Sequence, residues 1–247
     1  MKPIKSLSIA VATAMISLSA LADWYDELTL QDTKTMSLNA TDLSSLQLNI
    51  GAGSLTLNGS NSDKIQVNAK IYQAQAHSEY RLELTKNANT AQLSADNHNS
   101  DKQTKIDLEV LLPSHLYVKI NDGSGAMSLS NIASADIIDG SGSITVDNIT
   151  GDLTINDGSG NITINNIAGD LMINDGSGSI HAEMIKGSVR VEDGSGGITI
   201  NNVEQGVTIS DGSGSITVDH AASFTLLDDG SGGVKVSNIS GAVKMAD

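Results

Sequence analysis

No cysteine occurs among the 247 residues of this sequence. Its absence excludes disulfide bonds, thiolate chemistry and a lipid attached to an N-terminal cysteine. A chain without disulfides has to draw its stability from the burial of a hydrophobic core, also outside the reducing cytoplasm. The sequence is therefore expected to contain a pattern that buries aliphatic side chains.

Basic residues are also scarce, since 14 Lys and Arg stand against 29 Asp and Glu. Such an acidic chain repels nucleic acids and anionic membrane surfaces. It attracts cations and basic partners, although solubility alone is the plainest role of a surplus of acidic residues. The charge balance therefore excludes a nucleic-acid partner.

Long hydrophobic runs are absent except near the N-terminus. Two lysines precede an apolar stretch over residues 7–18, and Ala20-Leu21-Ala22 then leads to Asp23. This order is typical of a secretory signal peptide with small residues three and one before the cut. A membrane anchor is the alternative, but the stretch is too short and too rich in Ser and Thr to span a bilayer well.

We therefore expect a signal peptide at 1–22 and no membrane span after its removal. The mature chain would carry 12 basic and 29 acidic residues, a net charge of −17. The protein would be exported, either to the periplasm, to the cell surface or into the medium.

A short repeat dominates the second half of the chain. Copies of Asp-Gly-Ser-Gly follow one another after 17 or 18 residues and begin at Asp122, Asp139, Asp157, Asp175, Asp193, Asp211 and Asp229. A fixed short period is typical of a stacked repeat fold. Each unit divides into two related nine-residue halves, such as DGSGSITVD at 139 and NITGDLTIN at 148, so each half predicts one strand and one turn.

Alternation along these strands assigns their two faces. Ile144 and Val146 point to one side and Thr145 to the other, and Leu153 and Ile155 repeat the pattern. One unit cannot bury these aliphatic residues, but stacked units can, with equivalent strands paired about 4.8 Å apart. The sequence therefore predicts an all-β fold, a β-solenoid (parallel β-helix) of 18-residue coils with two short strands per coil.

The residues at the turns agree with stacking. Glycine in Asp-Gly-Ser-Gly permits positive φ and lets stacked backbones approach one another closely. Asparagine recurs at the opposite turn, where stacked amides form a ladder that Met184 and His220 interrupt. The ladder positions are Asn131, Asn148, Asn166, Asn202 and Asn238.

The segment before the repeats is less regular. LQLNIGAGSLTLN at 46–58 has the rhythm of a degenerate first coil, and three segments, 63–72, 79–86 and 105–113, alternate like strands. The polar segment 86–103 predicts an exposed hairpin or loop. The expected domains are the signal peptide at 1–22, an irregular N-terminal β cap with the degenerate first coil at 23–121, and solenoid repeats at 122–247.

The start of the repeats resembles a known family. LEVLLPSHLYVKINDGSGAMSLSNI at 108–132, followed by tandem Gly-Ser-Gly-x-aliphatic-x-aliphatic units, is similar to the bacterial "putative adhesin" β-strand-repeat family, related to auto-transporter-adhesin-like head domains. The resemblance covers residues 40–247. It implies a β-solenoid in an exported or envelope protein and carries over no catalytic residues.

One aspartate per coil forms the main candidate site. Two interpretations of this array, Asp122, Asp139, Asp157, Asp175, Asp193, Asp211 and Asp229, stay open. In the structural one, each carboxylate accepts the backbone N–H two residues later in an Asx turn. In the functional interpretation, adjacent carboxylates share Ca²⁺, because Ca²⁺ prefers hard oxygen ligands. Ca²⁺ is the one cofactor for which the sequence contains candidate ligands. The calcium site of β-roll toxins is absent, since Ile162 stands where their motif has its metal-binding Asp.

Other activities find less support. An outward column of Thr145, Thr163, Thr199 and Thr217 resembles an ice-binding face, but His181 and Lys235 interrupt it and threonine is a common exposed strand residue. The five histidines lack metal-ligand spacing, and Gly-Ser-Gly strings without a following helix are turns rather than nucleophile elbows. A polysaccharide lyase or hydrolase needs converging acids, bases and aromatic platforms, and the repeats contain one aromatic residue, Phe224.

The sequence thus favours an exported, non-enzymatic solenoid that presents repeated Asp, Ser, Thr and Asn to an unidentified surface protein or polymer. An acidic structural module that binds divalent cations is the alternative. The sequence leaves the partner, the handedness of the coil and the oligomeric state open.

The signal peptide yields a first prediction. We expect the exported protein to begin at Asp23, which mass spectrometry of periplasmic and culture fractions measures directly. Retention of residues 1–22 in a membrane fraction would mean that they form an anchor.

Overall fold

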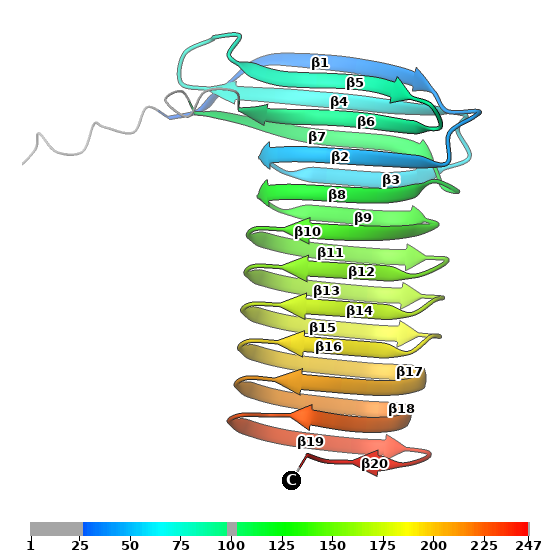
Figure 1. Cartoon of the computed structure of the whole chain (residues 1–247). Helices are drawn as coiled ribbons and strands as arrows, with labels where there is room; N and C mark the ends of the chain where they lie inside the picture. Colours follow the sequence, from blue (N-terminus) through cyan, green and yellow to red (C-terminus); the bar gives the residue numbers. More distant parts are fainter. Residues whose placement is uncertain (1–26, 98–102, 247) are drawn as a thin grey trace, which may run out of the picture.

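The computed structural model describes residues 27–97 and 103–246, so the predicted signal peptide and its cleavage site lie outside the described residues. These residues form 20 strands and no helix, coiled into a tall solenoid with a broader N-terminal end (Figure 1). Within them, no helix is long and apolar enough to cross a membrane. The predicted all-β solenoid is confirmed.

Two stacks of strands form the walls of the solenoid. The first sheet contains, in spatial order, β5 (Tyr80–Asn87), β6 (Thr90–Asn97), β2 (Ser45–Ala52), β8 (Tyr117–Ser124), β10 (Ser134–Asp139), β12 (Leu153–Asp157), β14 (Leu171–Asp175), β16 (Val189–Asp193), the second halves of β17 (Gly196–Asp211) and β18 (Gly214–Asp228), and β20 (Val243–Lys244). The second sheet contains β1 (Thr29–Asn39), β4 (Lys64–Gln73), β7 (Thr104–Pro113), β3 (Leu55–Ser60), β9 (Met127–Ile132), β11 (Gly142–Ile149), β13 (Gly160–Ile167), β15 (Gly178–Ile185), the first halves of β17 and β18, and β19 (Gly232–Ile239).

The coils stack in register with parallel pairing. Thr163 lies beside Thr145 in the preceding coil, and Leu171 lies beside Leu153. The inward positions of the two sheets fill one continuous aliphatic core. Ile162, Ile164 and Leu171 are at most 1% exposed, as the alternation predicted.

Close approach of stacked backbones explains the glycines of the Asp-Gly-Ser-Gly turn. Gly160 has φ of 147°, and a Cβ on it would lie 1.5 Å from the carbonyl oxygen of Gly142 in the coil before. Any side chain at this place would therefore separate the coils, and the same holds at the equivalent glycines of the other turns.

The opposite turn uses the left-handed conformation, and this explains its asparagines. Asn131, Asn148 and Asn166 each have φ of 59°, a region that asparagine tolerates better than most residues. Their amides form the predicted ladder, with Asn131 Nδ2 donating to Asn58 Oδ1 at 3.0 Å and Asn148 Nδ2 donating to Asn131 Oδ1 at 3.3 Å. Met184 and His220 occupy the same left-handed turn position and interrupt the ladder.

Irregular coils occur where the sequence departs from the repeat. Strands β2 and β3 form the degenerate first coil, in which Ile50 pairs with Asp122 and takes the place of an aspartate. Near the other end, the register between β17 and β18 shifts after Val203 and again after Ile209, so that Phe224 packs beside Val207. The first irregularity lies where the sequence predicts a degenerate coil.

Antiparallel strands close the N-terminal end of the stack. β1 pairs with β4 and β4 with β7 on the second sheet, while β5 pairs with β6 on the first. All of these strands lie within the segment for which the sequence predicts an irregular β cap (Figure 1).

One expectation about this segment is wrong in part. A hairpin turn is present, since β5 and β6 pair antiparallel across the turn between Asn87 and Thr90, but the hairpin is not exposed, because β6 is an internal strand between β5 and β2. Its inward residues Ala91, Leu93 and Ala95 are fully buried. Two of these three side chains are small and the outward ones are polar, so the segment resembles a loop in sequence although it is a core strand.

The register yields a second prediction. Ile164→Asp places an unpaired charge in the core and should lower the free energy of unfolding by several kcal/mol. Thr163→Asp, on the exposed neighbour, should change it by about 0.5 kcal/mol or less. Thermal and urea unfolding of the two variants measure the difference, and equal effects would contradict the assigned faces.

Candidate functional site

The aspartates of the repeat lie inside the solenoid. In β12 the inward alternation runs from Leu153 through Ile155 to Asp157, so the carboxylate takes the last inward position of the strand. Six aspartates in successive coils pair in register, and each is between 1% and 7% exposed. This internal aspartate file consists of Asp122, Asp139, Asp157, Asp175, Asp193 and Asp211.

Five members of the file form the predicted Asx turn. In each, one carboxylate oxygen accepts the backbone N–H of the serine two residues later, at 3.1–3.3 Å, as Asp157 Oδ1 does from Ser159. The turn needs aspartate because this hydrogen bond holds the chain reversal between the aspartate and the serine. The structural interpretation of the array is confirmed for these coils.

The second carboxylate oxygens have no such partner. The Oδ2 atom of every member of the file is buried without a hydrogen bond, and at Asp122 both oxygens are in this state. Burial, followed by the charge of the neighbouring aspartate, raises the pKa of Asp122 and Asp193 to about 6. Burial also raises the pKa of Asp139, Asp157, Asp175 and Asp211 above its usual value.

Stacked charges in this position are costly. Strands in a sheet lie about 4.8 Å apart, and two charges at that separation repel by about 3 kcal/mol where the effective dielectric constant is about 20. The five adjacent pairs of a fully ionised file would together cost about 15 kcal/mol, as much as the whole stability of a typical domain. The file therefore cannot carry its full negative charge without compensation.

The location of the file corrects one part of the functional hypothesis. These six aspartates are not presented to a partner on the outer surface, because they line the core. The seventh, Asp229, lies beyond the second register shift and is half-buried. Calcium binding by the array stays a prediction. No group of three or more His, Cys, Asp or Glu side chains in 27–97 and 103–246 is arranged to hold a metal ion.

The outer face of the second sheet carries three regular columns of polar side chains, which we call the polar face. The middle column contains Thr145, Thr163, His181, Thr199, Thr217 and Lys235. The columns on its two sides contain Ser143, Asn161, Ser179, Gly197, Ser215 and Gly233, and Asp147, Asn165, Glu183, Asn201, Asp219 and Ser237. Parallel register alone produces these columns, as the sequence predicted for the threonines.

Hydrogen bonds between coils hold the acidic column of the polar face. Asn165 Nδ2 donates to Asp147 Oδ1 at 2.9 Å, and Ser237 Oγ donates to Asp219 Oδ1 at 2.7 Å. The bonds from Ser237 and Asn238 lower the pKa of the Asp219 carboxyl. The ionised form of Asp219 is therefore favoured, whereas burial disfavours the ionised form in the file.

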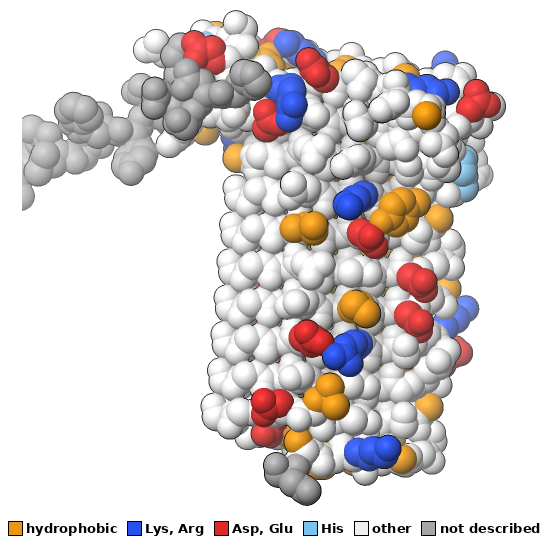
Figure 2. Space-filling view, viewed as in Figure 1, with side chains coloured by type: hydrophobic (Ala, Val, Ile, Leu, Met, Phe, Trp, Pro, Cys, Tyr) orange, Lys and Arg blue, Asp and Glu red, His pale blue; other side chains and the backbone are white. Residues whose placement is uncertain are grey.

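The face shown in Figure 2 differs from a regular array. Below the cap, its hydrophobic and charged side chains are few and stand singly or in small groups without a regular pattern. On the first sheet, Ile138 and Met172 are about half exposed, and Arg190 pairs with Glu192 within β16. No column of identical side chains comparable to the threonines of the polar face arises on this sheet.

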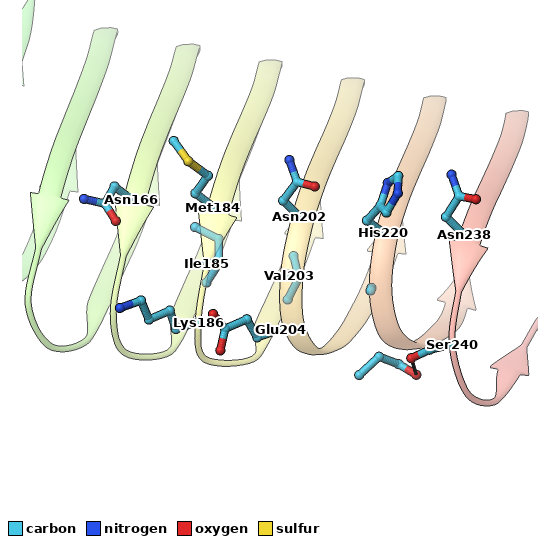
Figure 3. A pocket seen from close by; sticks show the side chains of 12 residues that line it. Asn166, Met184, Ile185, Lys186, Asn202, Val203, Glu204, His220, Asn238 and Ser240 are labelled. Carbon is cyan, nitrogen blue, oxygen red and sulfur yellow. Dashed lines mark hydrogen bonds between the residues drawn. The ribbon is translucent and has the colours of Figure 1, made fainter.

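A shallow groove follows the edge of left-handed turns. It is lined by residues of successive coils, with Met184, Asn202 and His220 in one row and Lys186 and Glu204 in the next (Figure 3). The groove coincides with the part of the edge where the asparagine ladder is interrupted. His220 Nδ1 lies 2.7 Å from Asp219 Oδ2, an interaction on the surface rather than in a closed pocket.

The histidines do not converge on a catalytic centre. His77 belongs to a hydrogen-bonded group with Gln73 and Thr104 that holds a cap loop, and His181 lies 3.8 Å from Glu183 on the polar face. His115 lies in the connection before β8, and His98 lies outside the described residues.

The sequence of this chain matches a known protein family. The model of the Toastrack DUF4097 family matches residues 43–246, and the chain belongs to this family. No curated protein matches the chain. The resemblance inferred from the sequence is therefore confirmed at the level of the family.

Solved structures are similar to this chain over most of its length. A protein of Bacteroides fragilis described as a putative adhesin is 14% identical, with a TM-score of 0.51 over 87% of this chain and 98% of its own. A putative adhesin of Parabacteroides distasonis is 13% identical, with a TM-score of 0.39 over 87% of this chain and 97% of its own. At such identity the first likeness shows the fold alone.

The buried charges yield a third prediction. Asp175→Asn keeps an oxygen that accepts the Ser177 N–H and removes one charge from the middle of the file. At pH 7.5 the weaker repulsion should raise the free energy of unfolding by about 1 kcal/mol. In a domain of this size, this raises the midpoint temperature of unfolding by roughly 2–4 °C above wild type.

Glu204→Gln, which removes an exposed charge, is the matched control for calorimetry and should leave the midpoint unchanged within about 1 °C. A lower midpoint for Asp175→Asn would show that the fold requires the negative charge.

Proposed function

We propose that this protein is an exported, non-enzymatic interaction module that attaches through its polar face to a repetitive surface or polymer. The in-register columns of that face carry the proposal. Each coil repeats nearly the same contact one strand spacing further along, so a partner with its own repeat meets many identical weak contacts at once. Such multivalency gives strong attachment from weak single contacts.

The interior supports attachment rather than turnover. Aliphatic side chains fill the space between the sheets from β2 to β18, so that part of the core offers no cavity for a cofactor or a reactant. Two described histidines, His181 and His220, lie beside surface carboxylates on an open face. Ser237 and His220 both bond to Asp219, so the carboxylate and not the histidine stands next to the serine hydroxyl, unlike the order in a catalytic triad. The family and the Bacteroides fragilis structure described as a putative adhesin agree with a binding role.

The expected location supports the same role. The N-terminal sequence pattern favours export, and the Bacteroides fragilis protein of the same fold is described as a putative adhesin, which supports a location in the envelope or outside the cell. The acidic column of Asp147, Glu183 and Asp219 favours a partner that is basic or bridged by cations. A neutral glycan would instead use the hydroxyl groups of the threonine column.

A matched pair of variants tests the polar face, our fourth prediction. Thr163→Lys with Thr199→Lys inserts bulk and charge into the middle column of the second sheet. Thr154→Lys with Thr208→Lys makes the same change on the outer side of the first sheet. Binding to a panel of envelope fractions, glycans and host-surface proteins, with and without Ca²⁺, should weaken at least tenfold for the first pair only.

Equal binding by wild type and both double variants would contradict recognition through the polar face. Hydrolysis of any glycan in the panel would contradict a non-enzymatic function. Circular dichroism of each variant establishes that the fold is intact before binding is compared.

A further inference from the structure

The charge of the internal aspartate file needs compensation, and the proposed attachment to a partner does not supply it. Six carboxylates are almost fully buried in one row, and seven of their oxygens have no hydrogen-bond partner. An unpaired buried carboxylate is among the most unfavourable groups in a protein interior. Something has to neutralise the row, and three kinds of partner are available in principle: a basic side chain, a metal ion or protons.

Basic side chains do not reach the file. Among the described residues, the charges that act on its members are those of other aspartates, with Asp229 acting on Asp211 at one end. At the other end, Asp122 stacks on Ile50. Across the core, the second-sheet strands from β11 to β19 begin with glycine, and they present aliphatic residues such as Ile162 and Ile180. In the cap, Lys105 pairs with Asp107 and Arg81 pairs with Asp96.

A metal ion fits the row poorly. One oxygen of each of five carboxylates is already occupied by a serine N–H, so each gap between neighbours offers mainly two free oxygens. Calcium takes six to eight oxygen ligands, and magnesium requires octahedral geometry. A proton, in contrast, needs a single oxygen and can be accommodated at every level of the file.

We propose that the internal aspartate file is a proton-binding site, which takes up protons when the chain folds in mildly acidic solution and loosens the solenoid as it ionises towards neutral pH. The half-buried Asp229, next in line after Asp211, gives the file a solvent-accessible end. The file would thus make the rigidity of the solenoid responsive to acidity. This inference does not depend on the proposed partner.

The direction of the effect follows from linkage. The pKa of each file member is higher in the folded protein than in the unfolded chain, near 6 for Asp122 and Asp193. Between the unfolded value of 3.8 and about 6, the folded state therefore binds more protons, and stability rises as pH falls through this range. Surface carboxylates with lowered pKa, such as Asp170 and Asp219, have the opposite effect, which begins at about pH 5 and grows as the pH falls further.

The pH dependence of unfolding tests the inference. The full mature chain should melt roughly 5 °C or more higher at pH 5 than at pH 7.5, the reverse of ordinary acid denaturation. Asp157→Asn with Asp193→Asn, which removes two alternate members of the file, should reduce this shift by at least half. Asp63→Asn with Glu204→Gln, two exposed carboxylates, should leave it unchanged.

Two measurements on wild type keep the test decisive even where a variant fails to fold. Potentiometric titration of folded and urea-unfolded protein at pH 5 should show about two or more extra protons bound by the folded state. Addition of CaCl₂ or of a chelator at pH 7.5 should leave the melting temperature unchanged. A flat or falling melting temperature on acidification would overturn the inference, and so would a strong stabilisation by calcium, which would make the file a metal site.

Discussion

Translation of one coil onto the next by a parallel backbone ladder is the constraint on which this structure depends. Because each strand pairs in register with its equivalent 17 or 18 residues away, every side chain lies beside the same position of the neighbouring coils. Isoleucine and valine therefore stack into a continuous core, and glycine is needed wherever two turns would otherwise collide. The repeat of the sequence is the consequence of this one geometric demand.

The same translation gives the two candidate sites their opposite characters. On the outside it multiplies a harmless choice, such as threonine on an exposed strand, into a column that a partner can contact many times. On the inside it multiplies an expensive choice, a carboxylate at the end of a strand, into a row of mutually repelling groups. The serine N–H bonds compensate one oxygen of five of these carboxylates, and the other oxygen remains without a partner.

Stacking also limits the chemistry that the fold can perform. Aliphatic side chains fill the core, so the polar groups of the repeat lie on the outer faces and in the aspartate file. This division is why the proposed function rests on an extended outer face. The less regular features, namely the antiparallel cap, the interrupted asparagine ladder and the register shifts near β18, are the places where this periodic surface ends or changes.

The sequence by itself determined the solenoid, its period and the faces of its strands, because each of these depends on residues that are close together in one repeat. It offered the Asx turn as one of two interpretations of the aspartate array, and the structure showed that the turn is formed. Membership in the family was also visible, from Leu112-Pro113 and the tandem units that follow. Only the tertiary structure decided that Asp157 and its equivalents are buried, since burial depends on how the coil closes around the end of the strand. It likewise decided that β6 is a core strand, because Ala91, Leu93 and Ala95 become interior only when β5 and β2 pair on either side.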